Sequence, residues 1–224
     1  MRISAGYELS SGVTDATALS VLDGSGGVVP VGGDMMAGAQ SQTSMEDTDE
    51  SDVVYVRASM LWAATEDTDA LVSVFHQENS ADSDTYMRLT DGQNSGEEWE
   101  NGRRFLTPGG FEADVISLEV ESDLGFATFS SSTSSTETTI SASNDISNLY
   151  ESIDEATGGL AYFGSPRLAF LTEADADYES VTQEFRLASN GDGDWDWVLG
   201  LYYHDSDSEL EVHDVDYSYE DWLA

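Results

Sequence analysis

The side chains that could do chemistry in this sequence are few, and their spacing fits no common reaction. The three histidines, His76, His204 and His213, lie too far apart for a metal-ligand motif. His204 precedes Asp205 and could act as a base, but no serine in a Gly-x-Ser-x-Gly motif or similar nucleophile accompanies it. We therefore expect that the chain is not an enzyme.

The segment NGDGD at 190–194 is a candidate calcium loop. Asp192, Asp194 and Asp196 could supply oxygen ligands, but no glutamate occupies the twelfth position that closes an EF-hand loop. Asn-Gly and Asp-Gly are also the preferred sequences of tight hairpin turns. We interpret the segment as a turn.

Two further acidic runs, 46–52 and 172–179, could collect divalent cations loosely, but solvated loop charge accounts for them more simply. The GSGG at 24–27 lacks the lysine and the following helix of a phosphate-binding loop. We therefore expect no metal site and no cofactor.

The charge of the chain limits its partners. It has 224 residues, of which 45 are acidic and 7 are basic, all of them arginine, so the formal net charge is −38. Such a charge repels phosphates, so we expect no nucleic-acid partner. The absence of lysine fits a protein exposed to salty water, where self-repulsion is screened. The alternative is a lumen or set of loops that selects a cationic or neutral ligand.

Alternation of apolar and polar residues predicts a protein built almost entirely of β-strands. In 53–64, Val54, Val56, Ala58, Met60 and Trp62 fall on one face, and Tyr55, Arg57 and Ser59 fall on the other. The same pattern predicts strands near 1–8, 53–64, 70–79, 112–122, 126–137, 179–189 and 195–212.

The links between these strands alternate in length. Tight turns are expected at 65–69, 123–125 and 190–194, and long acidic loops at 9–52, 80–111 and 138–178. A soluble antiparallel domain has mostly short links, whereas transmembrane barrels have short periplasmic turns and long extracellular loops. The alternation predicts an all-β fold: an antiparallel up-and-down transmembrane β-barrel segment of about seven strands, forming one domain over 1–224.

The last of these strands carries an aromatic stripe. In a barrel wall, Trp195 and Trp197 would lie in a lipid-facing girdle near the tight turn, and Tyr203 would lie near the other interface. Trp62 would belong to the same lipid-facing girdle. The alternative is a secreted, acidic β-sandwich that binds cations or glycans, in which the stripe would form the core.

Four segments resemble, in the same order, parts of the barrel of TonB-dependent outer-membrane receptors. VTQEFRLASNGDGDWDWVLGLYY, from Val181 onwards, resembles a Gln-Glu-(Phe/Leu)-Arg-Leu-Ala-Ser strand, a short glycine turn and a Trp-x-(Val/Ala)-x-Gly-x-(Phe/Tyr)-Tyr strand. The segments 56–83 and 117–134 resemble two hairpins of the same family, and RISAGYE at 2–8 resembles the strand before the first hairpin.

The resemblance implies an active transporter in the outer membrane of a Gram-negative cell. Such a receptor imports a scarce nutrient, for example a ferric siderophore, a cobalamin or an oligosaccharide. Its expected partners are outer-membrane lipid, the small-molecule nutrient and the TonB energy-coupling complex, which acts through a plug domain that this chain lacks. Because barrels of this type have about 22 strands, we expect the chain to be an internal piece of a longer receptor.

The polar side of each strand would then face the lumen and contact the ligand. The lumen-facing candidates are Tyr55, Arg57, Glu119, Glu184, Arg186, Tyr202 and His204. We expect Arg57 and Arg186 to pair with inward carboxylates such as Glu184. The long loops would capture the substrate, as loops on a rigid scaffold commonly do.

Overall fold

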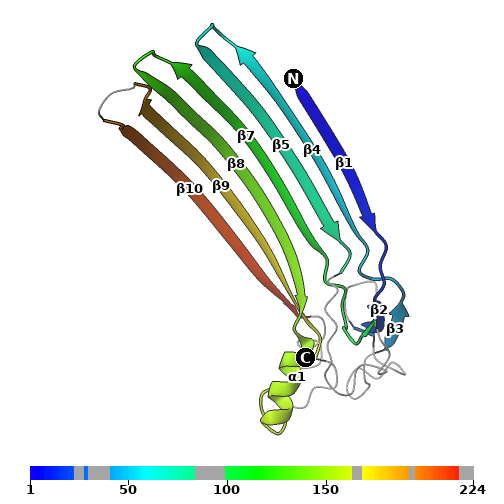
Figure 1. Cartoon of the computed structure of the whole chain (residues 1–224). Coiled ribbons are helices and arrows are strands. Elements are labelled where there is room, and N and C mark those ends of the chain that lie inside the picture. Colours follow the sequence, from blue (N-terminus) through cyan, green and yellow to red (C-terminus); the bar gives the residue numbers. More distant parts are fainter. Residues whose placement is uncertain (23–27, 30–40, 84–98, 163–167, 192–194, 217–224) are drawn as a thin grey trace.

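A single seven-stranded sheet forms most of the molecule. The computed structural model describes residues 1–22, 28–29, 41–83, 99–162, 168–191 and 195–216. The strands lie side by side in the order β1, β4, β5, β7, β8, β9, β10 (Figure 1). Their bounds are β1 Arg2–Ser10, β4 Ser51–Ala63, β5 Thr68–Ala81, β7 Gly109–Asp123, β8 Ala127–Asp145, β9 Phe170–Ser189 and β10 Val198–Asp216.

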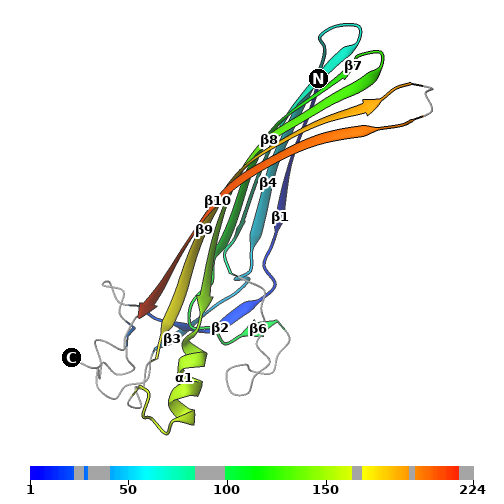
Figure 2. The same ribbon diagram turned by 90° about the vertical axis from the view of Figure 1, so that its left-hand side faces the viewer.

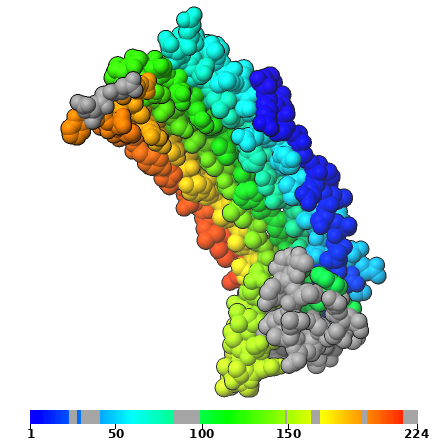
Figure 3. Space-filling model, viewed as in Figure 1, coloured from blue at the N-terminus to red at the C-terminus, as the bar shows by residue number. Residues whose placement is uncertain are grey.

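Every neighbouring pair in this sheet is antiparallel, which confirms the predicted all-β, antiparallel fold. The sheet is open: β1 and β10 are its two edges, and no closed barrel is present among the described residues. Seen from the side, the sheet is a single curved layer (Figure 2). The face turned to the viewer in Figure 3 is likewise not covered by a second sheet.

The hairpin turns gather at one end of the sheet (Figure 1). The link between β7 and β8 is closed by the Leu124 amide, which donates to the Ala127 carbonyl, and by the Gly125 amide, which donates to Asp123 Oδ1. Gly125 has a φ of 82°, which favours glycine because it has no Cβ. The β4–β5 link is closed by the Ala64 and Thr65 amides, which both donate to the Thr68 carbonyl.

At the other end, the strands run further than their sequence pattern predicted. β8 continues to Asp145 and β9 begins at Phe170, so the acidic run 172–179 lies within β9. Our interpretation of that run as loop charge was therefore wrong. Its backbone pairs with β8 and β10, while Glu173, Asp175, Asp177 and Glu179 alternate with uncharged residues.

The link between β9 and β10 is longer than the sequence pattern predicted. β10 begins at Val198, so Trp195 and Trp197 lie in the link before the strand rather than inside it. The Ser189 amide nevertheless donates to the Trp197 carbonyl, which extends the pairing with β9. Asp192, Asp194 and the GSGG segment at 24–27 lie outside the described residues.

The long links build a small folded unit at the end opposite the hairpins (Figures 1 and 2). It contains a second sheet of β2 (Asp15–Ser20), β3 (Gln42–Met45) and β6 (Glu100–Asn101), and one helix, α1 (Ser147–Ala156). Its apolar core is Val28, Phe105, Ala169 and Leu171. The sequence pattern predicted neither this sheet nor α1, because both are short. No helix in the described part of the chain is long and apolar enough to cross a membrane.

One buried arginine ties this unit together. The Arg104 side chain, 5% exposed, donates to the Leu168 carbonyl and to Glu151 of α1. The Arg104 amide donates to Asp145 Oδ2 at 2.6 Å, and the Ser147 amide donates to Asp145 Oδ1 at 3.0 Å. The link between β5 and β7 and the link between β8 and β9, which are distant in sequence, therefore meet around Arg104.

Candidate functional site

Strand pairing sorts the side chains of the main sheet onto two faces with different chemistry. Directly paired residues point to the same face of a sheet. The register therefore shows which residues of all seven strands share a face. We call the face that carries Val56, Val74 and Ile116 the apolar face. The opposite face, which carries Tyr55, Phe75 and Val115, is called the polar face because most of its other side chains are polar.

The apolar face carries an uncharged band near the hairpin end. Its apolar and aromatic members are Ile3, Ala5, Tyr7, Leu9, Val54, Val56, Ala58, Met60, Trp62, Ala70, Val72, Val74, Ile116, Leu118, Val120, Phe129, Val181, Phe185, Leu187, Leu199, Leu201 and Tyr203. Towards the long links, the next positions on this face turn acidic, as at Asp114, Glu137, Glu179 and Asp205. The chemistry of the face thus changes sharply with position along the strands.

This boundary slants across the sheet. Leu9, the last apolar position on β1, is paired with Asp52 of β4. On β10 the last uncharged residue before the acidic positions is Tyr203. Successive pairings across the sheet place Tyr203 in the same row as Met60 of β4. From β1 to β10 the boundary moves from the level of residue 52 to that of residue 60, but in unequal steps: across β7, β8 and β9 it stays in one row, because Asp114, Glu137 and Glu179 are directly paired. At about 3.3 Å per residue and about 4.8 Å between strands, the average slant from edge to edge is about 40°.

Three polar side chains inside the band, Gln183, Thr133 and Ser131, are joined by hydrogen bonds. Gln183 is the amide residue there, and it accepts a hydrogen bond from the Thr133 hydroxyl. The Gln183 amide nitrogen donates to Ser131 Oγ at 3.1 Å and to the carbonyl of Ser132 at 3.2 Å. The side-chain oxygen and nitrogen of Gln183 therefore both have protein partners on β8.

The aromatic residues proposed as a girdle are exposed. Trp195 is 83% exposed, Trp62 is 62% exposed, and Trp197 and Tyr203 are also open to solvent. The apolar residues between them are no better covered, since Leu199 and Leu201 are 65% and 66% exposed. The aromatic stripe is therefore not the core of a sandwich in the described part of the chain.

The polar face carries all seven lumen-facing candidates. The register places Tyr55, Arg57, Glu119, Glu184, Arg186, Tyr202 and His204 on this one face. Glu119, Glu184 and Arg186 lie in two neighbouring cross-strand rows near the hairpins. Leu71, Glu119, Ser132 and Glu184 form one row, and Asp69, Glu121, Ser130 and Arg186 form the next. The sequence alternation thus assigned the faces, and the register brought the strands together.

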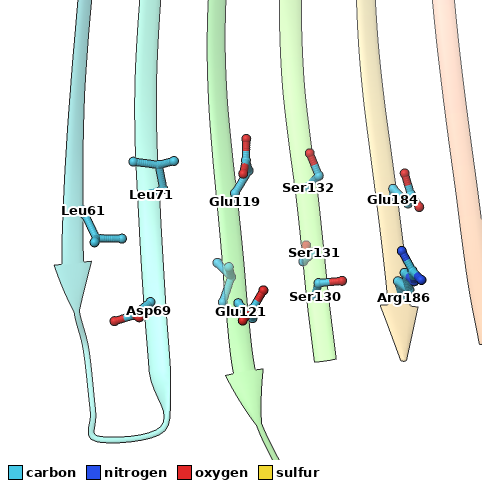
Figure 4. Close-up of a pocket in the computed structure, with 11 residues that line it drawn as sticks. Leu61, Asp69, Leu71, Glu119, Glu121, Ser130, Ser131, Ser132, Glu184 and Arg186 are labelled. Atoms are coloured by element: carbon cyan, nitrogen blue, oxygen red, sulfur yellow. The ribbon is translucent and has the colours of Figure 1, made fainter. Parts of the chain in front are cut away.

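These two rows line an open hollow of about 580 Å³. Figure 4 shows Glu119 and Glu184 at one level of the sheet, with Arg186 one step nearer the hairpins. The hollow holds four carboxylates, one guanidinium and several hydroxyls, and its walls come from β4, β5, β7, β8 and β9. Such a lining can bind polar or cationic groups, but it pairs no nucleophile with a base.

The expected ion pairs of the two arginines are not formed. Within the described residues, no carboxylate approaches Arg57 or Arg186 closely enough for an ion pair, so that prediction was wrong. Arg57 instead lies against Arg2, Ser4 and Ser59 in a second, smaller hollow. An open, solvated face explains the difference, because water satisfies each charge without the loss of side-chain entropy that an exposed ion pair requires.

His204 and Tyr202 lie close together on β10 without forming a catalytic pair. The His204 Nδ1 is 3.1 Å from the Thr182 hydroxyl, and the rings of Tyr202 and His204 are stacked with centroids 6.4 Å apart. Neither contact activates a nucleophile. Both residues present hydrogen-bonding groups to the polar face.

One perturbed carboxyl lies outside the strands of the main sheet. Burial alone would raise the pKa of Asp49, but hydrogen bonds from the Thr14 and Val13 amides and from the Thr14 hydroxyl outweigh burial and lower its pKa. The two amide nitrogens are each 2.7 Å from Asp49 Oδ1. Asp49 therefore fixes the start of the β1–β4 link to its end.

Comparisons with known proteins return no relative. No protein-family model, no curated protein and no solved structure matches the chain. A proposal of function therefore depends on the two faces of the sheet and on the slanted boundary between apolar and acidic positions.

Proposed function

We propose that the chain is part of the wall of an outer-membrane active transporter of the TonB-dependent receptor class. In this proposal the apolar face meets lipid and the polar face meets a water-filled lumen through which a scarce nutrient is imported. The nutrient is of the ferric siderophore, cobalamin or oligosaccharide class. The observation that carries the proposal is the slanted uncharged band on the apolar face.

The exposed apolar face needs a covering, and lipid is the covering that fits. Large exposed apolar patches on soluble proteins mark binding surfaces or membrane contacts. The band has no charged side chain, crosses all seven strands and is not covered by a second sheet among the described residues. The alternative, a soluble sandwich, requires such a sheet, so this observation favours the membrane wall.

The slant of the band matches the geometry of a barrel. Strands in closed barrels tilt by about 35–45° from the barrel axis, so a membrane plane crosses successive strands at shifted registers. The average slant of about 40° from β1 to β10 is of the size that this tilt requires, although the boundary stays in one row across β7, β8 and β9. On β4 the run from Val54 to Trp62 rises by about 20 Å after correction for the tilt, close to the apolar height of about 25 Å in outer-membrane barrels.

The direction of the edge strands limits how the wall is completed. The six antiparallel pairings make β1 and β10 run in the same direction. A copy of the same sheet in the same membrane orientation, placed with its β1 beside β10, would therefore form a parallel pair. In the proposed barrel, closure with antiparallel pairs requires an odd number of further strands between β10 and β1.

The acidic ends of the strands and the small folded unit would then lie outside the cell. The unit carries Arg104 and α1 on the long links, where a receptor captures its cargo. Import would be driven by the TonB energy-coupling complex, which acts through a plug domain in receptors of this class. The hollow lined by Glu119, Glu184 and Arg186 would lie in the lumen near the periplasmic turns.

Cysteine accessibility tests the wall directly, because the chain contains no cysteine. Single substitutions on β7 sample three environments: Leu118→Cys in the band, Ser117→Cys on the polar face, and Glu112→Cys on the apolar face beyond the band. In detergent micelles or lipid vesicles, we expect a charged, water-soluble maleimide to label Ser117→Cys and Glu112→Cys rapidly and Leu118→Cys slowly. Full labelling of all three after unfolding in urea is the control.

Equal labelling of Leu118→Cys and Ser117→Cys in the folded, lipid-reconstituted chain would contradict the wall. Protection of Leu118→Cys in plain buffer without detergent would instead indicate a soluble partner layer. The import role is tested separately by titrating the reconstituted chain with a ferric hydroxamate, a cobalamin and a linear oligosaccharide while monitoring tyrosine and tryptophan fluorescence. If none of the three binds at millimolar concentration, the proposal of nutrient import is wrong, and the proposal that the sheet is a membrane wall is unaffected.

A further inference from the structure

A mixed imidazole and carboxylate cluster lies on the apolar face, just beyond the uncharged band. His76 of β5 is directly opposite Asp114 of β7, and its Nδ1 is 3.0 Å from Asp114 Oδ1. Glu112, two residues along β7, shares this face. One ligand atom from each of the three side chains lies within 4.8 Å of the other two.

We propose that His76, Glu112 and Asp114 form a binding site for a divalent transition-metal ion such as Zn²⁺. An imidazole nitrogen with carboxylate oxygens suits this class of ion, whereas Ca²⁺ and Mg²⁺ prefer oxygen ligands alone. Ligand atoms at bonds of about 2.0–2.2 Å lie about 3.3 Å apart around a tetrahedral ion, so small side-chain rotations close the site. Three protein ligands leave one position for water or an external ligand.

The surrounding charges favour a cation at this position. Along one cross-strand row, Asp114 is opposite Glu137, which is opposite Glu179. In the neighbouring row, Glu78 is opposite Glu112. Like charges directly opposite each other destabilise a sheet, and a bound dication reverses part of that repulsion. His76 lies between Asp114 and the apolar Val56 in the first row, and it supplies the nitrogen that distinguishes this cluster from the acidic positions around it.

The other histidines offer no comparable set. His204 contacts the Thr182 hydroxyl, and His213 has one carboxylate nearby, with its Nε2 3.7 Å from a Glu211 oxygen. Among the residues that the structure describes, the trio on β5 and β7 is the cluster in which a histidine meets two carboxylates. The site needs only the pairing of β5 with β7, so it is independent of whether the band meets lipid.

Calorimetric titration with ZnCl₂ tests the site. The full chain is folded in detergent micelles, stripped with a chelator and titrated, and we expect one ion per chain with a dissociation constant of micromolar order. His76→Ala, Asp114→Asn and Glu112→Gln should each weaken binding by about tenfold or more. His204→Ala and His213→Ala are matched controls that should bind as the parent does.

Two further measurements separate a built site from loose attraction to the acidic surface. Co²⁺ bound in place of Zn²⁺ should show visible absorption that is lost in His76→Ala, and excess Mg²⁺ should not displace Zn²⁺. Circular dichroism checks that each variant keeps its strands. Zinc binding unchanged by His76→Ala, displacement by equimolar Mg²⁺, or no binding at millimolar Zn²⁺ would each overturn the proposal.

Discussion

At the scale of single residues, hydrogen bonds decide whether a polar side chain can lie on an apolar surface. Gln183 is placed between Phe185 and Val181 on the apolar face of β9, where an unpaired amide would be costly in lipid. Its oxygen and nitrogen are taken up by Thr133 and Ser131 of β8. Gln183 is a polar residue among apolar ones on this face, and the pairing of β9 with β8 supplies its partners.

We predict that Gln183→Leu alone destabilises the reconstituted chain by about 1–3 kcal/mol, because it leaves the Thr133 and Ser131 hydroxyls unpaired in an apolar environment. The double variant Gln183→Leu, Thr133→Val should recover most of that loss. Urea unfolding in micelles measures the free energy of unfolding of the parent, the two single variants and the double variant. Additive losses in the double variant would show that the hydroxyls are solvated and that the band does not meet lipid.

Asp49 gives a pH prediction at the same scale. Its pKa is lower in the folded chain than in the unfolded chain, so its contribution to stability is complete above the unfolded value of about 4. That contribution is lost as pH falls through the lower, folded value. We expect Asp49→Asn to abolish this difference.

Hydrogen exchange of the Val13 and Thr14 amides, followed from pH 6 downwards in the parent and in the Asp49→Asn variant, measures the effect. The parent should lose protection of these amides as pH falls through the lowered pKa of Asp49, and the variant should be weakly protected at every pH. An unchanged pH response in the variant would assign the effect to other carboxylates.

At the scale of the elements, the side chains on one face of a strand change from apolar to acidic along its length. On β9 the apolar face presents Leu187, Phe185 and Val181 near the hairpins, and then Glu179 and Asp177 towards the long links. The strand continues through this change because its backbone pairs with β8 and β10 throughout. Backbone pairing with β8 and β10 therefore determines how long β9 is. The side chains determine which environment each part of its face can meet.

A depth series on β9 separates lipid from water. In lipid, Phe185→Arg should cost about 2–4 kcal/mol, whereas Asp177→Arg on the same face should cost about 0–1 kcal/mol. Reversible unfolding in phospholipid vesicles measures both variants. Equal, small costs at the two positions would contradict a band that meets hydrocarbon.

The buried Arg104 gives a second prediction for the elements. Arg104→Leu removes the contacts to Glu151 and Leu168, so we expect α1 and its flanking links to lose about 2–4 kcal/mol of local stability. Hydrogen exchange over 147–156 measures this loss, with the amides of β7 as the internal reference. Arg57→Leu on the open polar face is the matched control and should leave α1 unchanged.

At the scale of the whole molecule, a single curved sheet with a net charge of −38 must withstand its own repulsion. Most of its buried apolar residues lie in the small folded unit and the strand ends beside it, not on the apolar face. The acidic ends of β9 and β10 lie directly opposite each other, as in the pairs Glu179 with Asp207 and Asp177 with Glu209. Screening of these charges should therefore govern overall stability.

We predict that the melting temperature in micelles rises between dilute buffer and about 2 M NaCl, where the Debye length is only a few ångströms. A protein that functions in saline water would show this dependence. Uncharged sucrose at equal osmolality is the control for general solvent effects. A chain no more stable in molar salt than in dilute buffer would contradict the salt-water interpretation of its charge.

The sequence by itself determined which side chains share a face, because the period of two in a strand depends only on local backbone geometry. For that reason Tyr55, Glu119 and Arg186 could be assigned together before any strand was paired. The alternation could not reveal how far β8 and β9 extend, because serine, threonine and alternating acids fit strand and loop equally well. Only the tertiary structure set the register, which brings His76 to Asp114 and Thr133 to Gln183 and slants the band across the sheet. Contacts between strands depend on loop closure and on pairing over long sequence distances, and those are properties of the whole chain.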